Sequence, residues 1–193
     1  MILIACGASL LAACGPKPPL RMMSCAAAPA VPVRTEGESR TATLSVLTYN
    51  LEGLGWPARK GRARELAEIG SRLAAMHATG TAPDVVLFQE MFIPAAKRAV
   101  AASGYPAIAP GPRRTDSPSA ANGRMPGTAK PLKGEVGLRL LGGGLAIASR
   151  YPIVATETDA FGRRACAGLD CLANKGVMLA RVQAIGCYPI TPQ

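Results

Sequence analysis

Residues 83–90 read PDVVLFQE and predict a buried strand that ends on a carboxylate. Val85–Gln89 is a continuous apolar run introduced by a Pro-Asp pair, which is typical of a strand covered on both faces. Upstream, Thr41–Asn50 (TATLSVLTYN) alternates and is rich in Thr, Val and Leu, which predicts a second strand. Both predicted strands are therefore followed or closed by a polar side chain, Glu90 in one case and Asn50 in the other.

The segment between these strands predicts a helix over Arg62–Ala78, because its apolar residues recur at helical spacing opposite Arg and Glu. That stripe consists of Leu66, Ile69, Leu73 and Met76. A short helix is predicted over Pro94–Ser103. Further strands are predicted over Gly104–Ala109, Gly144–Ser149, Ile153–Thr158 and Lys175–Val182. This order predicts an α/β domain with helices covering sheet faces.

Asn50 and Glu90 are the first candidates for chemistry. Ligands collect at strand ends of α/β sheets, and a carboxylate there is costly unless it meets a cation or a donor. An amide oxygen beside a carboxylate makes an oxygen-rich site suited to Mg²⁺. The alternative from the residues alone is that Asn50 is a turn residue and Glu90 a solvated charge.

The composition restricts the classes of protein and of partner. The chain has 193 residues and a formal charge of +10, and 49% of its residues are hydrophobic, which excludes full disorder. Six cysteines are too few and too scattered for a dense disulfide scaffold. The basic balance fits phosphate esters, nucleic acid or acidic lipid. Pro110–Lys133 is a Pro/Gly/Ser-rich basic segment that predicts a long loop.

The first residues predict an export signal. Met1–Ala13 is short and almost wholly apolar, and Leu11–Cys14 (LAAC) resembles the lipobox of bacterial lipoproteins, whose cysteine is acylated. We therefore expect residues 1–14 to form a lipoprotein-type signal with Cys14 lipidated, and the protein to be a membrane-anchored lipoprotein of the bacterial cell envelope. A plain secretory signal and a buried N-terminal strand are the alternatives.

A tether is predicted next. Residues 15–40 are rich in Pro, Ala and Met without a sustained period, which indicates a flexible link between a membrane surface and a domain over 41–193. A lipid anchor with basic residues nearby would hold that domain at the membrane.

Three motifs in this domain carry a family resemblance: LSVLTYNLEG, PDVVLFQEMF and GGGLAIASRYPI. In this order they resemble the endonuclease/exonuclease/phosphatase superfamily, the deoxyribonuclease-I-like metallohydrolases. The resemblance covers about Leu44–Val182 and implies a four-layer α/β/β/α sandwich of two mixed sheets. It also implies that Asn50 and Glu90 flank a catalytic Mg²⁺ beside the scissile phosphate.

The stretch DCLANKGVMLARV, from Asp170, resembles the sphingomyelinase-like branch of this superfamily. Lys175 within it could lie near a phosphodiester as a point charge, or could be a surface lysine in a turn. Cys166 and Cys171 could form a small-loop disulfide in an exported protein. We do not expect a metal site there, because two thiols without a neighbouring His are too few ligands.

Hydrolysis in the superfamily needs a general base and an acid, which the resemblance places on an N-T-H-type strand, a G-D-x-N turn and a terminal S-D-H. None of these motifs occurs in the chain, and its one histidine, His77, is predicted to be a helix-end residue near the C-terminal dipole. We therefore expect the domain over 41–193 to be incomplete, truncated at the C-terminus or frameshifted, and its hydrolysis to be impaired.

Two functional hypotheses follow. The first is a membrane-anchored, Mg²⁺-dependent phosphodiester hydrolase whose substrate is a phospholipid or a nucleic acid. The alternative is a non-catalytic surface lipoprotein that retains part of the fold as a binding module.

Overall fold

The computed structural model describes residues 30–56, 58–119, 131–133, 137–162, 166 and 168–184. The predicted signal with Cys14 lies outside these ranges, as do most of the predicted tether and part of the basic loop. Among the helices described, none is both long enough and apolar enough to cross a bilayer.

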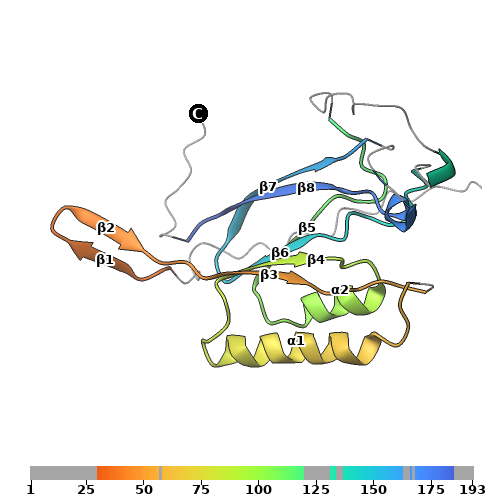
Figure 1. Ribbon diagram of the computed structural model, residues 1–193. Helices are drawn as coiled ribbons and strands as arrows, with labels where there is room; N and C mark the ends of the chain where they lie inside the picture. The colour runs from red at the N-terminus through yellow and green to blue at the C-terminus, as the bar shows by residue number, and fades with distance from the viewer. Residues whose placement is uncertain are drawn as a thin grey trace, which may run out of the picture.

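A mixed sheet of four strands forms the centre of the molecule, in the order β3-β4-β6-β5 (Figure 1). The strands are β3 (Val46–Asn50), β4 (Val85–Gln89), β5 (Ala107–Pro110) and β6 (Ala146–Ser149). β3 and β4 are parallel, whereas β6 runs antiparallel to both β4 and β5. β4 has the predicted bounds and is an interior strand, which explains its apolar run, with Val86 and Phe88 fully or almost fully buried.

Two helices cover one face of this sheet (Figure 1). α1 (Ala63–Ala78) begins one residue later than predicted, and α2 (Pro94–Ala101) follows β4 with Pro94 in its first turn. Leu66 and Leu73 of α1 are buried in the core, as the helical stripe predicts. The two helices approach closely at Gly70. A Cβ at this position would lie only 2.7 Å from the carbonyl oxygen of Ala99, so glycine permits the contact.

A second layer of strands covers the opposite face of the sheet. β7 (Ile153–Ala160) and β8 (Gly176–Val182) pair antiparallel, and Ile153 forms an apolar cluster with Ala107 and Ala109 of β5. Figure 1 shows this pair above the mixed sheet and the helices below it. The predicted α/β class is confirmed, with helix, mixed-sheet and strand-pair layers; in the described residues the second sheet is a single antiparallel pair. Short 3₁₀ helices lie at Pro131–Lys133 and Gly168–Leu172.

Part of the segment predicted as a flexible tether, residues 15–40, contributes to a strand pair in the structure. β1 (Val33–Glu36) and β2 (Ser39–Ala42) form an antiparallel hairpin closed at Gly37, whose φ of 61° suits glycine. Before it, Val31 is buried and its amide donates to the carbonyl of Ala184 at 2.8 Å. A turn residue between alternating Val, Thr and Arg explains the hairpin. This strand pattern is difficult to recognise in the sequence because the neighbouring residues are rich in Pro and Ala.

β3 is an edge strand with one open face. Leu47 and Tyr49 pack on the core, while Val46, Thr48 and Asn50 are exposed, with Val46 at 59%. The predicted strand over Thr41–Asn50 is thus divided between β2 and β3, and its alternation reflects one covered and one open face.

Candidate functional site

The carboxyl ends of β3 and β4 bring Asn50 and Glu90 to the same edge of the mixed sheet. The two strands are parallel neighbours with Asn50 in register with Gln89, so that Glu90 is one residue beyond the pair. The amide of Leu51 donates to the carbonyl of Gln89 at 3.0 Å, which extends the ladder past the last residue of β3. Neighbouring strands lie about 4.8 Å apart. The sequence predicts both residues at strand ends, and the structure makes those two strands parallel neighbours.

Glu90 has a left-handed backbone with φ of 56°, which is rare for a residue with a side chain. Contacts on both sides hold it there: the amide of Met91 donates to the carbonyl of Gly144 at 2.8 Å, and that of Ile93 to Gly53 at 3.1 Å. Such a conformation costs about 1–3 kcal/mol and persists where the surroundings over-determine it, often at functional sites. The backbone turn thus fixes the point at which the Glu90 side chain leaves the sheet.

Gly144 is needed beside this turn for steric reasons. A Cβ on Gly144 would overlap the ring of Phe92, two residues after Glu90, and its φ is 70°. The predicted strand over Gly144–Ser149 consequently begins only at Ala146, because Gly144 is part of the loop that packs against Phe92.

Asn50 forms the start of a turn with Glu52. Its Oδ1 accepts the amide proton of Glu52 at 2.7 Å, while the carboxylate of Glu52 accepts from Nε of Arg59 at 2.6 Å. Arg62 donates to the carbonyl of Leu51 at 3.0 Å and lies 4.0 Å from the Glu52 carboxylate. The arginines balance Glu52, so this second carboxylate near the strand ends carries a compensated charge. Sequence reasoning missed this group, although the acid follows Asn50 by two residues.

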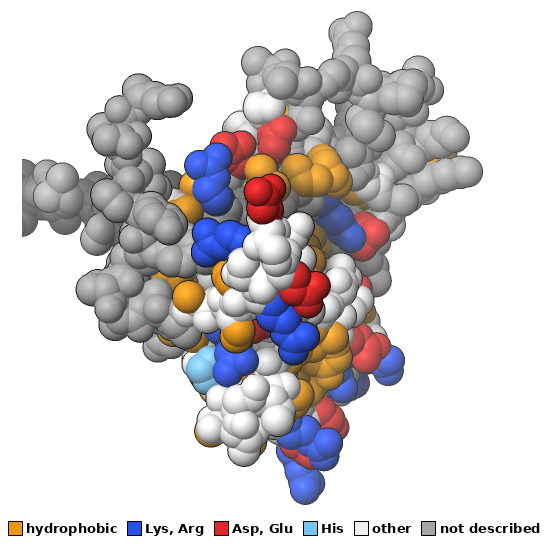
Figure 2. Space-filling model, turned by 90° about the vertical axis from the view of Figure 1, so that its left-hand side faces the viewer, with side chains coloured by type: hydrophobic (Ala, Val, Ile, Leu, Met, Phe, Trp, Pro, Cys, Tyr) orange, Lys and Arg blue, Asp and Glu red, His pale blue; other side chains and the backbone are white. Residues whose placement is uncertain are grey.

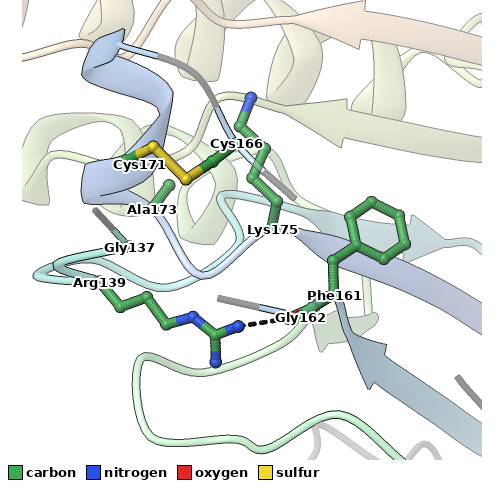
Figure 3. A pocket seen from close by; sticks show the side chains of 8 residues that line it. All are labelled: Gly137, Arg139, Phe161, Gly162, Cys166, Cys171, Ala173 and Lys175. Carbon is green, nitrogen blue, oxygen red and sulfur yellow. Dashed lines mark hydrogen bonds between the residues drawn. A yellow bond between two sulfur atoms is a disulfide. The ribbon is translucent and has the colours of Figure 1, made fainter. Parts of the chain in front are cut away.

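Lys175 precedes β8 and forms an ion pair with Asp170, with Nζ 3.0 Å from Oδ1. A disulfide at a Cα separation of 5.0 Å joins Cys166 to Cys171, which lies in the 3₁₀ helix that carries Asp170. Figure 3 shows Lys175 and the disulfide lining one small pocket with Arg139 and Phe161. Lys175 is therefore neutralised by a neighbouring carboxylate rather than presented alone, and it belongs to the β7–β8 layer.

The model of the Endonuclease/Exonuclease/phosphatase family matches residues 47–182, from the second residue of β3 to the last residue of β8. The chain belongs to this family. Among curated proteins, no sequence matches it.

Solved structures with the same fold agree with this family. Sphingomyelinase C from Streptomyces griseocarneus is 25% identical with a TM-score of 0.50, over 76% of this chain and 47% of that one. A beta toxin variant from Staphylococcus aureus with bound magnesium ions is 22% identical with a TM-score of 0.51, over 72% and 44%. The predicted family and its sphingomyelinase-like branch are confirmed. The chain spans less than half the length of these two structures.

Metal binding by the described residues of this chain would have to rest on few protein ligands. No group of three or more His, Cys, Asp or Glu side chains occurs in the described part of the chain. The Glu90 carboxylate has no hydrogen bond or ion pair to other described residues, and Asn50 Oδ1 retains acceptor capacity beside its one bond. Mg²⁺ usually keeps several waters and takes one or two carboxylates. The donor set therefore fits Mg²⁺ bound largely through water and substrate oxygens.

The one histidine of this family member lies at the opposite edge of the sheet. His77 is in the last turn of α1, with its ring edge-on to Tyr105 at 5.3 Å between centroids. Burial lowers the pKa of His77, and the charge of Arg150 lowers it further. Figure 2 looks onto this edge and shows the pale blue histidine beside basic side chains. His77 is therefore remote from Asn50 and Glu90, in agreement with its predicted role at a helix end.

Asn174 is a buried polar residue that sequence reasoning passed over for its neighbour Lys175. It is fully buried, and its Nδ2 donates to the carbonyls of Arg113 at 2.6 Å and Asp116 at 2.9 Å. Asp116 in turn accepts from the amide of Arg113 at 2.8 Å. The segment before β8 thus fixes the first turn of the basic loop, and the Asn-Lys-Gly sequence was the only available signal.

Proposed function

We propose that the edge formed by Asn50 and Glu90 binds Mg²⁺ and a phosphodiester, and that the protein is a metal-dependent phosphodiester hydrolase acting on a phospholipid or a nucleic acid. The observation that carries this proposal is the pairing of Asn50 with the residue before Glu90 on parallel strands, with Glu90 fixed in a left-handed turn. Membership of the Endonuclease/Exonuclease/phosphatase family and the fold shared with sphingomyelinase C support it.

Each residue of this edge has a separate task in the proposal. The Glu90 carboxylate and the Asn50 amide oxygen hold the ion, which supplies positive charge to a phosphoryl oxygen when bound. The Glu52–Arg59 ion pair keeps the second carboxylate from adding uncompensated negative charge where an anionic substrate must approach. Arg62, whose side chain is 22% exposed, anchors the intervening backbone at Leu51.

Proton transfer is the step for which this edge has least provision. General-base catalysis contributes about 10²–10⁴-fold to such reactions. The one histidine of the chain, His77, lies at the other end of the sheet. We therefore propose that this chain hydrolyses its substrate slowly. The second candidate, a binding module without catalysis, is favoured by this same placement of His77.

Metal binding is tested by the thermal midpoint of the full chain with Mg²⁺ and with EDTA. A ligand that binds only the folded state at 100 times its dissociation constant adds about 2.7 kcal/mol, which raises the midpoint by several degrees. Glu90→Gln should abolish this rise. Glu65→Gln, at an exposed carboxylate in the first turn of α1, is the matched control and should retain it. No Mg²⁺-dependent rise in the unsubstituted chain would refute the metal site.

Hydrolysis is tested separately with bis(p-nitrophenyl) phosphate as the probe. Slow, Mg²⁺-dependent release of nitrophenolate that Glu90→Ala abolishes supports the hydrolase. A Mg²⁺-dependent rise in the midpoint without any turnover supports the binding module instead. Turnover that survives Glu90→Ala contradicts the assignment of this edge as the site.

Export and anchoring are proposed for the same protein. The Cys166–Cys171 disulfide supports an oxidising compartment, because such bonds are rare in reducing cytosol. Incorporation of labelled palmitate in bacteria that is lost in Cys14→Ser supports an acylated Cys14. Unchanged incorporation in that variant excludes Cys14 as the anchor.

A further inference from the structure

We propose that the protein docks directly on a lipid surface that contains anionic phospholipid, through a face built from a leucine-rich segment and a cluster of cations. This leucine face consists of Leu138, Leu140, Leu141, Lys97, Arg113 and Arg114. Docking through it is independent of the proposed acyl anchor and of hydrolysis.

Three leucines of one short segment are exposed together. Leu138 is 62% exposed, Leu140 60% and Leu141 40%. Single exposed apolar residues are ordinary on protein surfaces, whereas adjacent ones rimmed by polar groups mark interaction sites. The concentration of leucines over four consecutive positions therefore indicates a surface that meets an apolar phase.

Two hollows flank this segment, and Arg114 lines both. One, of about 480 Å³, lies between Arg114–Pro118 and the pair Leu138 and Arg139. The other, of about 350 Å³, is lined by Leu140 and Leu141 together with cationic and apolar side chains. Those further residues are Lys97, Arg113, Arg114, Met91, Phe92 and Leu145. The leucines thus stand among pockets large enough for single headgroups or chain ends.

The leucine face carries three cations. Within the described ranges, Lys97, Arg113 and Arg114 are exposed and form no ion pair. The nearest acid in the loop, Asp116, accepts the backbone amide of Arg113. Each basic residue close to an anionic membrane contributes about 1 kcal/mol to binding. The charge of this face therefore complements an anionic lipid surface.

The segment is held rigidly rather than presented on a free loop. The amides of Arg139 and Leu141 donate to the carbonyls of Cys171 at 3.0 Å and Leu172 at 2.8 Å, and the Asn174 amide donates to Leu141 at 2.9 Å. Figure 3 shows the Arg139 guanidinium bonded to the carbonyl of Phe161. Because the backbone of this segment is bonded to residues 171–174, the leucines are presented from a fixed backbone, and docking costs little ordering entropy.

The kind of side chain distinguishes a lipid surface from a nucleic acid. Nucleic-acid platforms stack bases on aromatic rings, each worth about 1–3 kcal/mol, whereas the outward residues here are aliphatic. Leucine beside Arg and Lys is the composition of interfacial membrane-binding surfaces. Met91 and Phe92 of the second hollow directly follow Glu90, so docking would bring the proposed phosphodiester site to the lipid.

Co-sedimentation of the full chain with vesicles tests the proposal. All variants carry Cys14→Ser, so that acylation contributes nothing, and the buffer contains EDTA, so that metal binding and hydrolysis do not enter. Phosphatidylcholine vesicles with phosphatidylserine should bind the chain, and phosphatidylcholine alone should bind it more weakly. Leu138→Ser/Leu140→Ser should weaken binding about tenfold, from the apolar area no longer buried. Arg113→Gln/Arg114→Gln should remove the preference for phosphatidylserine.

Two matched variants control for the loss of exposed apolar side chains and of positive charge elsewhere on the protein. Val177→Ser/Leu179→Ser changes side chains that are 54% and 67% exposed on β8, and Arg34→Gln/Arg64→Gln removes exposed cations of β1 and α1. Both should bind vesicles as the parent does, and each variant is accepted only with an unchanged circular dichroism melt.

The proposal is overturned if the leucine variant binds vesicles normally or if the β8 variant loses binding equally. Binding to a DNA oligonucleotide, but not to vesicles, through Arg113 and Arg114 would overturn it in favour of a nucleic acid. A dimer in sedimentation velocity that Leu138→Ser/Leu140→Ser dissociates, without vesicle binding, would assign the face to a second copy.

Discussion

Gly53 lies so close to Glu90 that a Cβ at position 53 would overlap the carbonyl oxygen of Glu90 and lie 2.6 Å from the Cβ of Ala96. We expect Gly53→Ala to force the loop after β3 away from the end of β4. Overpacking of this kind costs about 1–3 kcal/mol. The variant should therefore melt at a lower temperature and lose the Mg²⁺-dependent rise in the midpoint.

Gly55→Ala is the control for this prediction. A Cβ at position 55 would have its nearest neighbour, Cγ2 of Ile93, at 3.4 Å, so an alanine fits there with little displacement. We expect its melting curve and its response to Mg²⁺ to match those of the parent. An equal fall in melting temperature and in Mg²⁺ response in both variants would contradict the prediction. It would show that the loop tolerates no added methyl group, whatever its distance from Glu90.

The elements next to these residues show what the sequence could predict. β4 has the predicted bounds because a strand buried on both faces leaves a continuous apolar run. The bounds of α1 differ from the prediction by only one residue, because an apolar stripe that packs on a single core makes the helix easy to recognise. Asn50 and Glu90 could be selected as site candidates because polar residues that end apolar strands are visible in a single sequence.

Other features depend on contacts between distant parts of the chain. The bonds from Asn174 to Arg113 and Asp116 join residues 61 and 58 positions apart, and no local pattern announces them. The left-handed turn at Glu90 depends on Gly53 and Gly144, which come from two other loops. The role of Asn174 and the geometry of Glu90 could therefore be learned only from the fold.

Asn174→Leu should destabilise the protein through the basic loop. The substitution preserves the branched shape of the side chain but leaves the partly buried carbonyls of Arg113 and Asp116 without their donor, at a cost of about 1–3 kcal/mol. Chemical denaturation measures this loss, and limited proteolysis should show faster cleavage within residues 111–119. Ser119→Ala, which removes an exposed bond to Asp159, should change the stability by no more than about 0.5 kcal/mol.

His77 should make stability depend on pH just below neutrality. Burial, aided by Arg150, lowers its pKa from 6.5, so the unfolded chain takes up the proton first as the pH falls. The contribution of neutral His77 is complete above pH 6.5 and is lost as the pH falls through the lower, folded pKa. His77→Gln should reduce the slope of a plot of the free energy of unfolding against pH between 6.5 and the lower, folded pKa. The same slope in the variant would assign the dependence to another group.

Asp84 should make stability depend on pH in a more acidic range. Burial alone would raise the pKa of Asp84, but hydrogen bonds from the Ser45 amide and hydroxyl, the Tyr151 hydroxyl at 2.9 Å, and the charge of Arg150 outweigh it, so the pKa is lowered. The folded state therefore favours the carboxylate, and its contribution is present above the ordinary value of 3.8 and lost as the pH falls through the lower, folded pKa.

Asp84→Asn and Tyr151→Phe test this acid dependence at two levels. Asp84→Asn should remove the slope below pH 3.8 and lower the stability at neutral pH by about 1–3 kcal/mol, because Ser45 and Tyr151 lose a charged acceptor. Tyr151→Phe removes one donor and should cost about 1 kcal/mol while leaving a reduced slope. Urea unfolding at a series of pH values measures both. An Asp84→Asn protein with the parent's acid slope would exclude Asp84 as its source.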